Sequence, residues 1–119
     1  NDYNTVDGTA IRDFIHVSDL ANIHVEVAKY LLEKKQSNVF NCGYGKGYSV
    51  LEVINAANKI TGNKINYEYD KRRAGDAKKL VSNVEKLHKN IKWKPKYNNI
   101  NSLIQTSIDW EKKIYEKNI

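Results

Sequence analysis

The stretch Thr9-Ala-Ile-Arg-Asp-Phe-Ile-His-Val17 decides how the chain is organised. It is rich in β-branched and aromatic residues, which are typical of strands, and it predicts a strand over residues 9–17. The period then changes to that of a helix, because apolar side chains recur at Leu20, Ile23, Val27, Ala28 and Leu31. Ser18 can cap this helix and Asp19 favours its positive end, so we expect a helix over about residues 18–35.

The middle of the chain repeats this change from strand to helix. Residues 38–42 are interpreted as a short strand, and residues 43–47 form a glycine-rich turn. Ser49 and Glu52 match a capping box, which predicts a helix from there to Gly62. Residues 65–69 alternate between apolar and polar side chains as a strand does, so a β-α-β unit is expected.

The last third of the chain is predicted to be mainly helical. A basic loop over residues 71–76 and a short apolar stretch at Leu80-Val81 come first. A helix is expected over about 83–90, and an amphipathic closing helix is expected from about residue 99. The fold class is therefore α/β, a small mixed domain with short strands and about four helices.

Composition narrows the kind of protein. At 119 residues, the chain has room for one compact domain, over residues 1–119, which would bury roughly two-thirds of its unfolded surface. It begins with Asn1 and contains no Met, so we expect it to be part of a longer protein. No apolar run approaches the roughly 18 residues of a membrane span, and no membrane association is expected. Cys42 is the single cysteine, which excludes an internal disulfide and fits a cytoplasmic protein.

The net charge of +6 favours an anionic partner, either a phosphate ester or nucleic acid. Lysine makes up seventeen of the twenty basic residues, and the lysines are spread along the chain. A basic nucleic-acid-binding module, with eight tyrosines as stacking platforms, is thus the alternative from another functional class. Because such modules cluster their charge, we do not expect a nucleic-acid partner.

The three arginines occur at only two places, Arg12 in the first strand and Arg72-Arg73 in the basic loop. Guanidinium groups bind phosphate oxygens in a planar, bidentate way that lysine cannot reproduce. The two places could therefore converge on one diphosphate. Alternatively, Arg12 pairs with Asp13 or Asp19 while the loop arginines are solvated, and physical reasoning alone leaves both possibilities open.

Other motifs give weaker signals. Gly43, Gly45 and Gly47 form G-x-G-x-G rather than the dinucleotide-binding G-x-G-x-x-G, so we interpret them as a tight turn. Two Tyr-x-x-x-Lys matches, at residues 30–34 and 67–71, are expected by chance and are not assigned a catalytic role. The three histidines share no metal-ligand spacing, so neither a catalytic residue nor a metal site is expected.

Three ordered motifs resemble one family. Asp2-Tyr-x-Thr-x-Asp-Gly-Thr-x-Ile-Arg-Asp-Phe-Ile-His-Val-x-Asp-Leu-Ala21 is similar to a segment of UDP-glucose 4-epimerases. Asn41-x-Gly-x-Gly-x-Gly-x-Ser-Val50 and Arg72-Arg-x-Gly-Asp76 follow at intervals like those of the family. The similarity covers nearly the whole chain, and three motifs in the same order make it specific.

The resemblance implies a fold, an activity and a cofactor. Members of this family are extended short-chain dehydrogenase/reductase proteins, in which an N-terminal Rossmann domain binds NAD and a smaller C-terminal domain binds the UDP-sugar. The present chain resembles the C-terminal domain. Bound NAD+ oxidises the sugar at C4, the 4-keto intermediate rotates about its diphosphate linkage, and hydride returns to the other face. The chain alone is expected to be inactive, and the parent enzyme is expected to be a homodimer.

The resemblance also implies roles for individual residues. Arg12 and Arg73 match the arginines that hold the diphosphate, and Asp76 matches the carboxylate that binds the uridine ribose. Phe14 replaces a more usual tyrosine, which removes a hydroxyl from the substrate site. Leu80 lies where the family gates the sugar pocket, and a residue smaller than tyrosine there predicts that N-acetylated sugars are also accepted. Another nucleotide-sugar epimerase or a 4,6-dehydratase is the nearest alternative.

Overall fold

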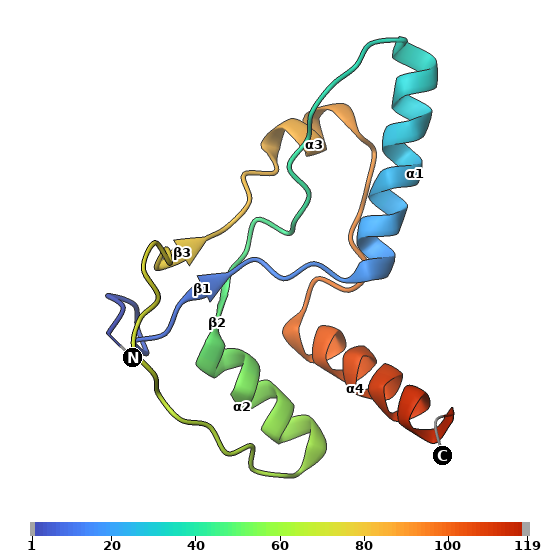
Figure 1. The fold of residues 1–119 in the computed structure, drawn as a ribbon. Coiled ribbons are helices and arrows are strands. Elements are labelled where there is room, and N and C mark those ends of the chain that lie inside the picture. Colours follow the sequence, from blue (N-terminus) through green and yellow to red (C-terminus); the bar gives the residue numbers. More distant parts are fainter. Residues whose placement is uncertain (1, 118–119) are drawn as a thin grey trace.

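The structure, a computed structural model that describes residues 2–117, contains a small three-stranded sheet. Its middle strand is β1 (Ile11–Arg12), which pairs antiparallel with β2 (Tyr48–Ser49) and parallel with β3 (Lys79–Leu80) (Figure 1). The strand predicted over residues 9–17 is therefore correct in place but too long. Only the part that has partners on both sides forms ladder hydrogen bonds.

Helix α1 (Val17–Lys34) confirms the first predicted helix to within one residue at each end. Its cap differs from the prediction, because His16 takes the capping position and its Nδ1 accepts a hydrogen bond from the Ser18 N–H at 3.0 Å. The other ring nitrogen of His16 lies 3.0 Å from the Thr106 hydroxyl. His16 is thus a hydrogen-bonded structural residue.

Helix α2 (Val50–Thr61) begins and ends where the sequence predicts. Ser49 and Glu52 form the reciprocal capping box, and Gly62 adopts the left-handed conformation that ends the helix, at φ 69°. The closing helix, α4 (Ile100–Lys117), packs against α2 in the lower half of Figure 1. Asn99 accepts a hydrogen bond from the Ser102 N–H at its start, which explains why the predicted boundary is correct within one residue.

The main hydrophobic cluster lies between α1 and the short helix α3 (Glu85–Asn90), in the upper half of Figure 1. Cys42 is partly buried and packs against this cluster. Contacts across the cluster join segments that are far apart in the sequence. Its buried members are Ile23, Leu87, Ile91 and Trp93.

The buried side chain of Asp19 links the start of α1 by hydrogen bonds to residues 96–97, in the segment that precedes α4. It accepts hydrogen bonds from the Tyr44 hydroxyl at 2.7 Å and from the N–H groups of Lys96 and Tyr97. Burial alone would raise the pKa of this carboxyl, but these hydrogen bonds outweigh it and hold the pKa below its usual value. Asp19 therefore stabilises tertiary structure, in addition to the helix-end role predicted for it.

Two predicted strands are wrong. Neither residues 38–42 nor residues 65–69 form a strand, so the β-α-β unit expected in the middle of the chain is absent from the described residues. Residues 65–69 are exposed, and they belong to none of the three strands within residues 2–117. Alternating side chains suit a strand, but a strand also needs a partner within hydrogen-bonding distance. The segments that supply partners for β1 are 48–49 and 79–80.

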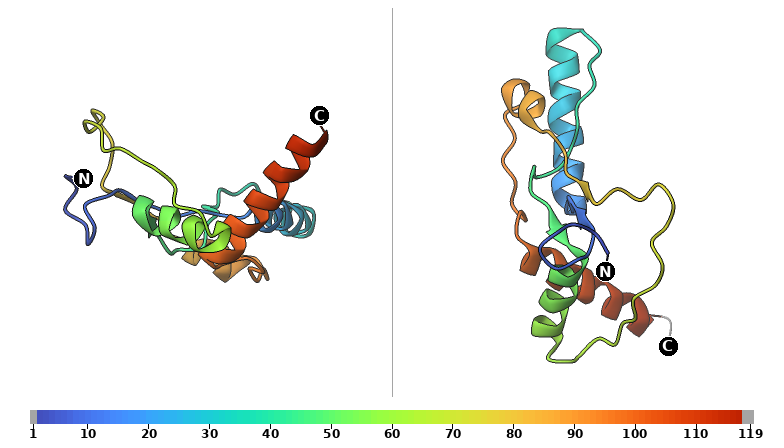
Figure 2. Two further views of the ribbon diagram at one scale, coloured as in Figure 1. Left: turned by 90° about the horizontal axis from the view of Figure 1, so that it is seen from below. Right: turned by 90° about the vertical axis from the view of Figure 1, so that its left-hand side faces the viewer.

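The chain is more extended than a compact domain of its length. The chain measures 50 × 41 × 22 Å, and Figure 2 shows its helices and sheet in a shallow layer. Its radius of gyration of 17.3 Å exceeds the roughly 14 Å of a compact chain of this length. The accessible surface is 9106 Å², against about 6,600 Å² for a compact protein of the same mass. Helices pack beside one another here rather than around one core.

No helix within residues 2–117 has the length and apolar character needed to cross a lipid bilayer.

Candidate functional site

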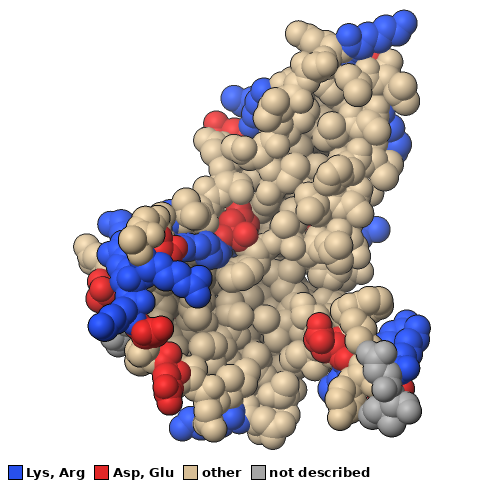
Figure 3. All heavy atoms as spheres, in the orientation of Figure 1, with Lys and Arg blue, Asp and Glu red and all other residues tan. Residues whose placement is uncertain are grey.

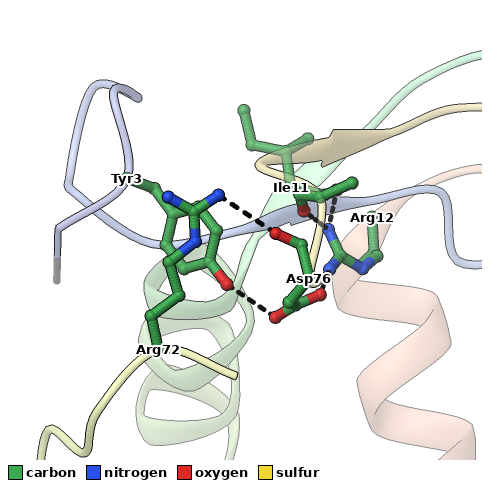
Figure 4. Close-up of polar contacts among 6 residues, drawn as sticks. Tyr3, Ile11, Arg12, Arg72 and Asp76 are labelled. Atoms are coloured by element: carbon green, nitrogen blue, oxygen red, sulfur yellow. Dashed lines mark hydrogen bonds and ion pairs between the residues drawn. The ribbon is translucent and has the colours of Figure 1, made fainter. Parts of the chain in front are cut away.

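Arg12 and Asp76 meet at the edge where β1 and β3 run parallel (Figure 4). One terminal nitrogen of the guanidinium, Nη2, donates to Asp76 Oδ1 at 2.5 Å. The other, Nη1, donates to the carbonyl oxygens of Ile11 and Ala77 at 2.8 and 2.9 Å. Arg12 is therefore held by three acceptors, and its ion pair is with Asp76 rather than with Asp13 or Asp19.

Asp76 is also bound from its other side. The Tyr3 hydroxyl donates to Asp76 Oδ2 at 2.6 Å, so the two carboxylate oxygens have different partners. The Arg72 guanidinium covers the Tyr3 ring at 4.3 Å from its centroid and donates to the Asp76 backbone oxygen at 3.1 Å. In Figure 4 the carboxylate lies between Tyr3 and Arg12, with Arg72 stacked on the tyrosine.

These contacts change the acid–base properties of the site. The hydrogen bond from Tyr3 is the main cause that lowers the pKa of Asp76; desolvation opposes it, while the charges of Arg12 and Arg73 add to it. The same hydrogen bond raises the pKa of the Tyr3 hydroxyl. At neutral pH Asp76 is therefore ionised and Tyr3 remains a hydrogen-bond donor.

The other predicted site residues lie at different places relative to the Arg12–Asp76 ion pair. Leu80 is the register partner of Arg12 across the parallel ladder, and its side chain is exposed. Arg73 begins the turn that ends at Asp76, and its guanidinium has no hydrogen-bond or ion-pair partner among residues 2–117. Phe14 lies beyond the end of β1, half-exposed. Four of the five predicted residues thus lie at one edge of the sheet or in the adjoining loop.

Charge gathers at this edge. In Figure 3 Lys and Arg side chains crowd the region that Figure 1 assigns to β3 and the loop before it, with several acidic side chains among them. Much of the remaining visible face carries neither sign. The loop arginines extend the cationic character of Lys71, Lys78 and Lys79, so an anionic ligand is favoured there.

The glycine turn does not fit a dinucleotide. Asp13 accepts hydrogen bonds from the N–H groups of Tyr44 and Gly45, at 3.1 and 3.0 Å, and from that of Ser82 at 3.2 Å. A carboxylate thus occupies the donors that a pyrophosphate would need. A Cβ at Gly43 would lie 2.5 Å from Asp13 Oδ2, which explains why glycine is required at this position. The turn is structural, in agreement with the sequence interpretation.

Tyr3 is the residue of this site that sequence reasoning did not consider, and Arg72 was considered only as one of the arginines that could bind a diphosphate. Tyr3 is part of the first family-like motif, and Arg72 belongs to the loop motif, so the signal was present in both quoted stretches. No spacing rule could join them, because Tyr3 and Asp76 are 73 positions apart.

Comparison with known proteins identifies the class. The family model described as GDP-mannose 4,6 dehydratase matches residues 2–106, and the chain belongs to this family. Within it, the resemblance to UDP-glucose 4-epimerases is confirmed. The chain is 44% identical over 110 residues to UDP-glucose 4-epimerase of Lacticaseibacillus casei, a match that covers 92% of the chain and 33% of that relative.

Solved structures agree in fold. The UDP-Glc/GlcNAc 4-epimerase of Campylobacter jejuni superposes with a TM-score of 0.85 at 46% identity, covering 94% of this chain and 34% of that one. The UDP-glucose 4-epimerase of Bifidobacterium longum, solved in complex with NAD+ and UDP, gives 0.82 at 40% identity, covering 94% and 33%. The mixed α/β class is thus confirmed, and the chain spans about a third of the length of the relatives it matches.

Proposed function

We propose that this chain is the C-terminal, nucleotide-sugar-binding portion of a UDP-glucose 4-epimerase, an isomerase that interconverts UDP-glucose and UDP-galactose. The observation that carries the proposal is the meeting of Arg12, the loop arginines and Asp76 at one edge of the sheet. Similarity to epimerases, one of them solved with NAD+ and UDP, supplies the chemical identity of the ligand.

The diphosphate is assigned to Arg12 and Arg73. Arg73 has an uncommitted guanidinium within residues 2–117, and Arg12 already holds an anionic group, the Asp76 carboxylate. Both features suit the bidentate binding of phosphate oxygens. During epimerisation the diphosphate is the fixed pivot while the keto-sugar rotates, so strong contacts belong at the pivot and weak ones at the sugar.

Asp76 is assigned to the uridine ribose and Phe14 to the wall of the same site. An ionised carboxylate accepts hydrogen bonds from ribose hydroxyls, and the lowered pKa of Asp76 keeps it ionised at neutral pH. Phe14 can contribute apolar contact only, because it has no hydroxyl.

Leu80 is assigned to the sugar pocket, where its side chain leaves room for an N-acetyl group. Its exposed position beside Arg12 and the 46% identity to an epimerase named for both UDP-Glc and UDP-GlcNAc support this assignment. The whole enzyme should therefore convert UDP-N-acetylglucosamine as well as UDP-glucose. Leu80→Tyr should lower kcat/KM for the acetylated sugar selectively; equal losses for both sugars would contradict the assignment.

NAD is assigned to residues outside this chain, since the glycine turn does not fit a dinucleotide. NAD supplies the reversible hydride transfer at C4 when bound. The residues described here hold the nucleotide and provide none of the proton-transfer groups, so the chain alone should be inactive. A homodimeric, cytoplasmic parent enzyme is part of the same proposal.

An NMR titration with UDP at low salt tests the proposed function. Saturable shifts should centre on the sheet edge, and Arg12→Ala and Arg73→Ala should each weaken binding at least tenfold, as expected for loss of a charge-assisted contact. Lys29→Ala is the matched control, because Lys29 pairs with Glu26 on α1. A folded spectrum that millimolar UDP leaves unchanged would contradict nucleotide binding by this chain.

A second candidate is another NAD-dependent nucleotide-sugar enzyme of the family, either a different epimerase or a 4,6-dehydratase. The match to the GDP-mannose 4,6 dehydratase family model supports this second candidate. Titration with GDP and with UDP distinguishes an enzyme of GDP-sugars from an enzyme of UDP-sugars, because a guanine-specific site should prefer GDP.

A further inference from the structure

We propose that Tyr3 is a positioning residue of the nucleotide site: it holds one oxygen of Asp76 in place while Arg12 releases the other oxygen to the ribose and turns to the diphosphate. This inference rests on the proposed function. It goes beyond that function because it assigns a role to the first loop of the chain and distinguishes the Asp76 contact that is kept from the one that is exchanged.

The two oxygens of Asp76 have separate partners. Oδ1 accepts from Arg12 at 2.5 Å, and Oδ2 accepts from Tyr3 at 2.6 Å. A carboxylate that loses its only strong partner is free to rotate, whereas one still bound through its second oxygen keeps its orientation. Departure of Arg12 therefore leaves Oδ1 open toward a ribose hydroxyl, with Asp76 held by Tyr3.

Tyr3 can act as an anchor because its own loop is fastened to the sheet and to α2. The Tyr3 N–H donates to the Gly8 oxygen at 3.3 Å, and the Tyr3 oxygen accepts from Thr5 N–H at 2.8 Å. Asp7 accepts from both the N–H and the hydroxyl of Thr9 and from the hydroxyl of Ser49, the cap of α2. The Tyr3 hydroxyl thus extends from a closed loop rather than from a free terminus.

Arg72 completes the anchor. Its guanidinium lies on the Tyr3 ring and donates to the Asp76 backbone oxygen, so one side chain clamps both partners of the hydrogen bond. Arg73, the next residue, has no such contact within residues 2–117. Adjacent arginines therefore have different tasks: Arg72 fixes the loop, and Arg73 is available to the ligand.

The exchange at Arg12 is feasible because the ion pair is accessible. The side chains of Arg12 and Asp76 retain 27% and 35% of their exposure, so water and a phosphate can compete with the carboxylate. Breaking a buried pair would leave an uncompensated charge, but here the incoming diphosphate replaces one anion by another at Arg12.

The test compares UDP with 2′,3′-dideoxyuridine diphosphate, which lacks the ribose hydroxyls. Dissociation constants are measured by calorimetry on the complete protein that carries this sequence, as wild type and as Tyr3→Phe. Wild type should prefer UDP about tenfold or more. Tyr3→Phe should reduce this preference about fivefold, the value of one hydrogen bond, and leave the dideoxy affinity within about twofold.

Each alternative outcome has a distinct meaning. If wild type binds neither nucleotide, the proposed function fails and this inference fails with it. If wild type binds both equally, Asp76 does not hold the ribose and Tyr3 has no such role. If wild type prefers UDP but Tyr3→Phe keeps the full preference, or weakens both nucleotides equally, the site stands and the positioning role is overturned.

Tyr30→Phe is the matched control. Tyr30 lies on α1, and its hydroxyl accepts a hydrogen bond from the Asn38 side chain, remote from the site. This variant loses the same hydroxyl group but should change neither affinity. Circular dichroism of both variants confirms that the fold is retained.

Discussion

Two aspartates in this chain each accept a hydrogen bond from a tyrosine hydroxyl, yet they serve different ends. Asp19 is 2% exposed, and its remaining partners are backbone N–H groups of residues 96 and 97. Asp76 keeps about a third of its side-chain exposure, and its remaining partner is the side chain of Arg12. Backbone donors cannot leave, whereas a side-chain donor can be exchanged for a ligand. The first arrangement stabilises the fold, and the second is suited to binding.

Asp19→Asn should produce the largest effect on stability. The amide replaces one of the two acceptor oxygens by an NH2 donor that would face other donors, so part of the buried hydrogen bonds would be lost and the free energy of unfolding should fall by about 3 kcal/mol. Asp76→Asn, at the exposed position, should cost much less. Urea unfolding of both variants measures the difference, and equal losses would remove the distinction between the two aspartates.

Acid should weaken the same buried contact. Because folding lowers the pKa of Asp19, its contribution is fully present above the unfolded value of about 4 and is lost as the pH falls through the lower folded value. The difference in unfolding free energy between wild type and Asp19→Asn should therefore shrink from pH 6 to pH 3. A gap that stays constant over this range would show that ionisation of Asp19 contributes nothing.

Tyr44→Phe should have an intermediate effect. The Tyr44 hydroxyl donates to Asp19 and also accepts from the His16 N–H at 3.1 Å. It therefore links the cap residue of α1 to the first turn of the helix. Loss of these bonds in a partly buried place should cost about 1.5 kcal/mol. Thermal unfolding followed by circular dichroism measures it, and a neutral result would mean that the two backbone donors suffice for Asp19.

Tyr3→Phe should have the smallest effect on stability, because its hydrogen bond to Asp76 is only partly buried. Thermal unfolding of Tyr3→Phe and Tyr44→Phe under the same conditions compares the loss of one hydroxyl group at each position. A loss at Tyr3 as large as that at Tyr44 would indicate that the exposed contact is structural too.

The helices were the predictable part of the fold. Ser49, Glu52 and Gly62 form local signals that act within one turn of chain, and the structure has α2 between them. The strands could not be predicted in the same way, because strand pairing depends on segments far apart in the sequence. Arg12 pairs with Tyr48 and Leu80, and neither residue lies in a stretch with clear alternation of apolar and polar side chains. Sequence patterns describe what a segment can do, not which neighbour it meets.

The site shows the same division. Arg12 and Asp76 could be named from family-like motifs, and the structure joins them by an ion pair 64 positions apart. Tyr3 could not be assigned, because only the folded loop brings its hydroxyl to Asp76. Asp13 was considered as a partner of Arg12, but it instead accepts hydrogen bonds from backbone N–H groups of the glycine turn. The sequence does not show that these two segments approach each other.

The flat shape of the chain has a consequence for how its backbone exchanges hydrogen with water. A layer 22 Å thick is only about two helix diameters deep. Few amides can be distant from solvent, so slow exchange should be confined to α1 near Ile23 and to the residues around Leu87 and Trp93, where burial is nearly complete. The sheet edge that carries Arg12 and Asp76 should exchange through local opening, well before the hydrophobic cluster does.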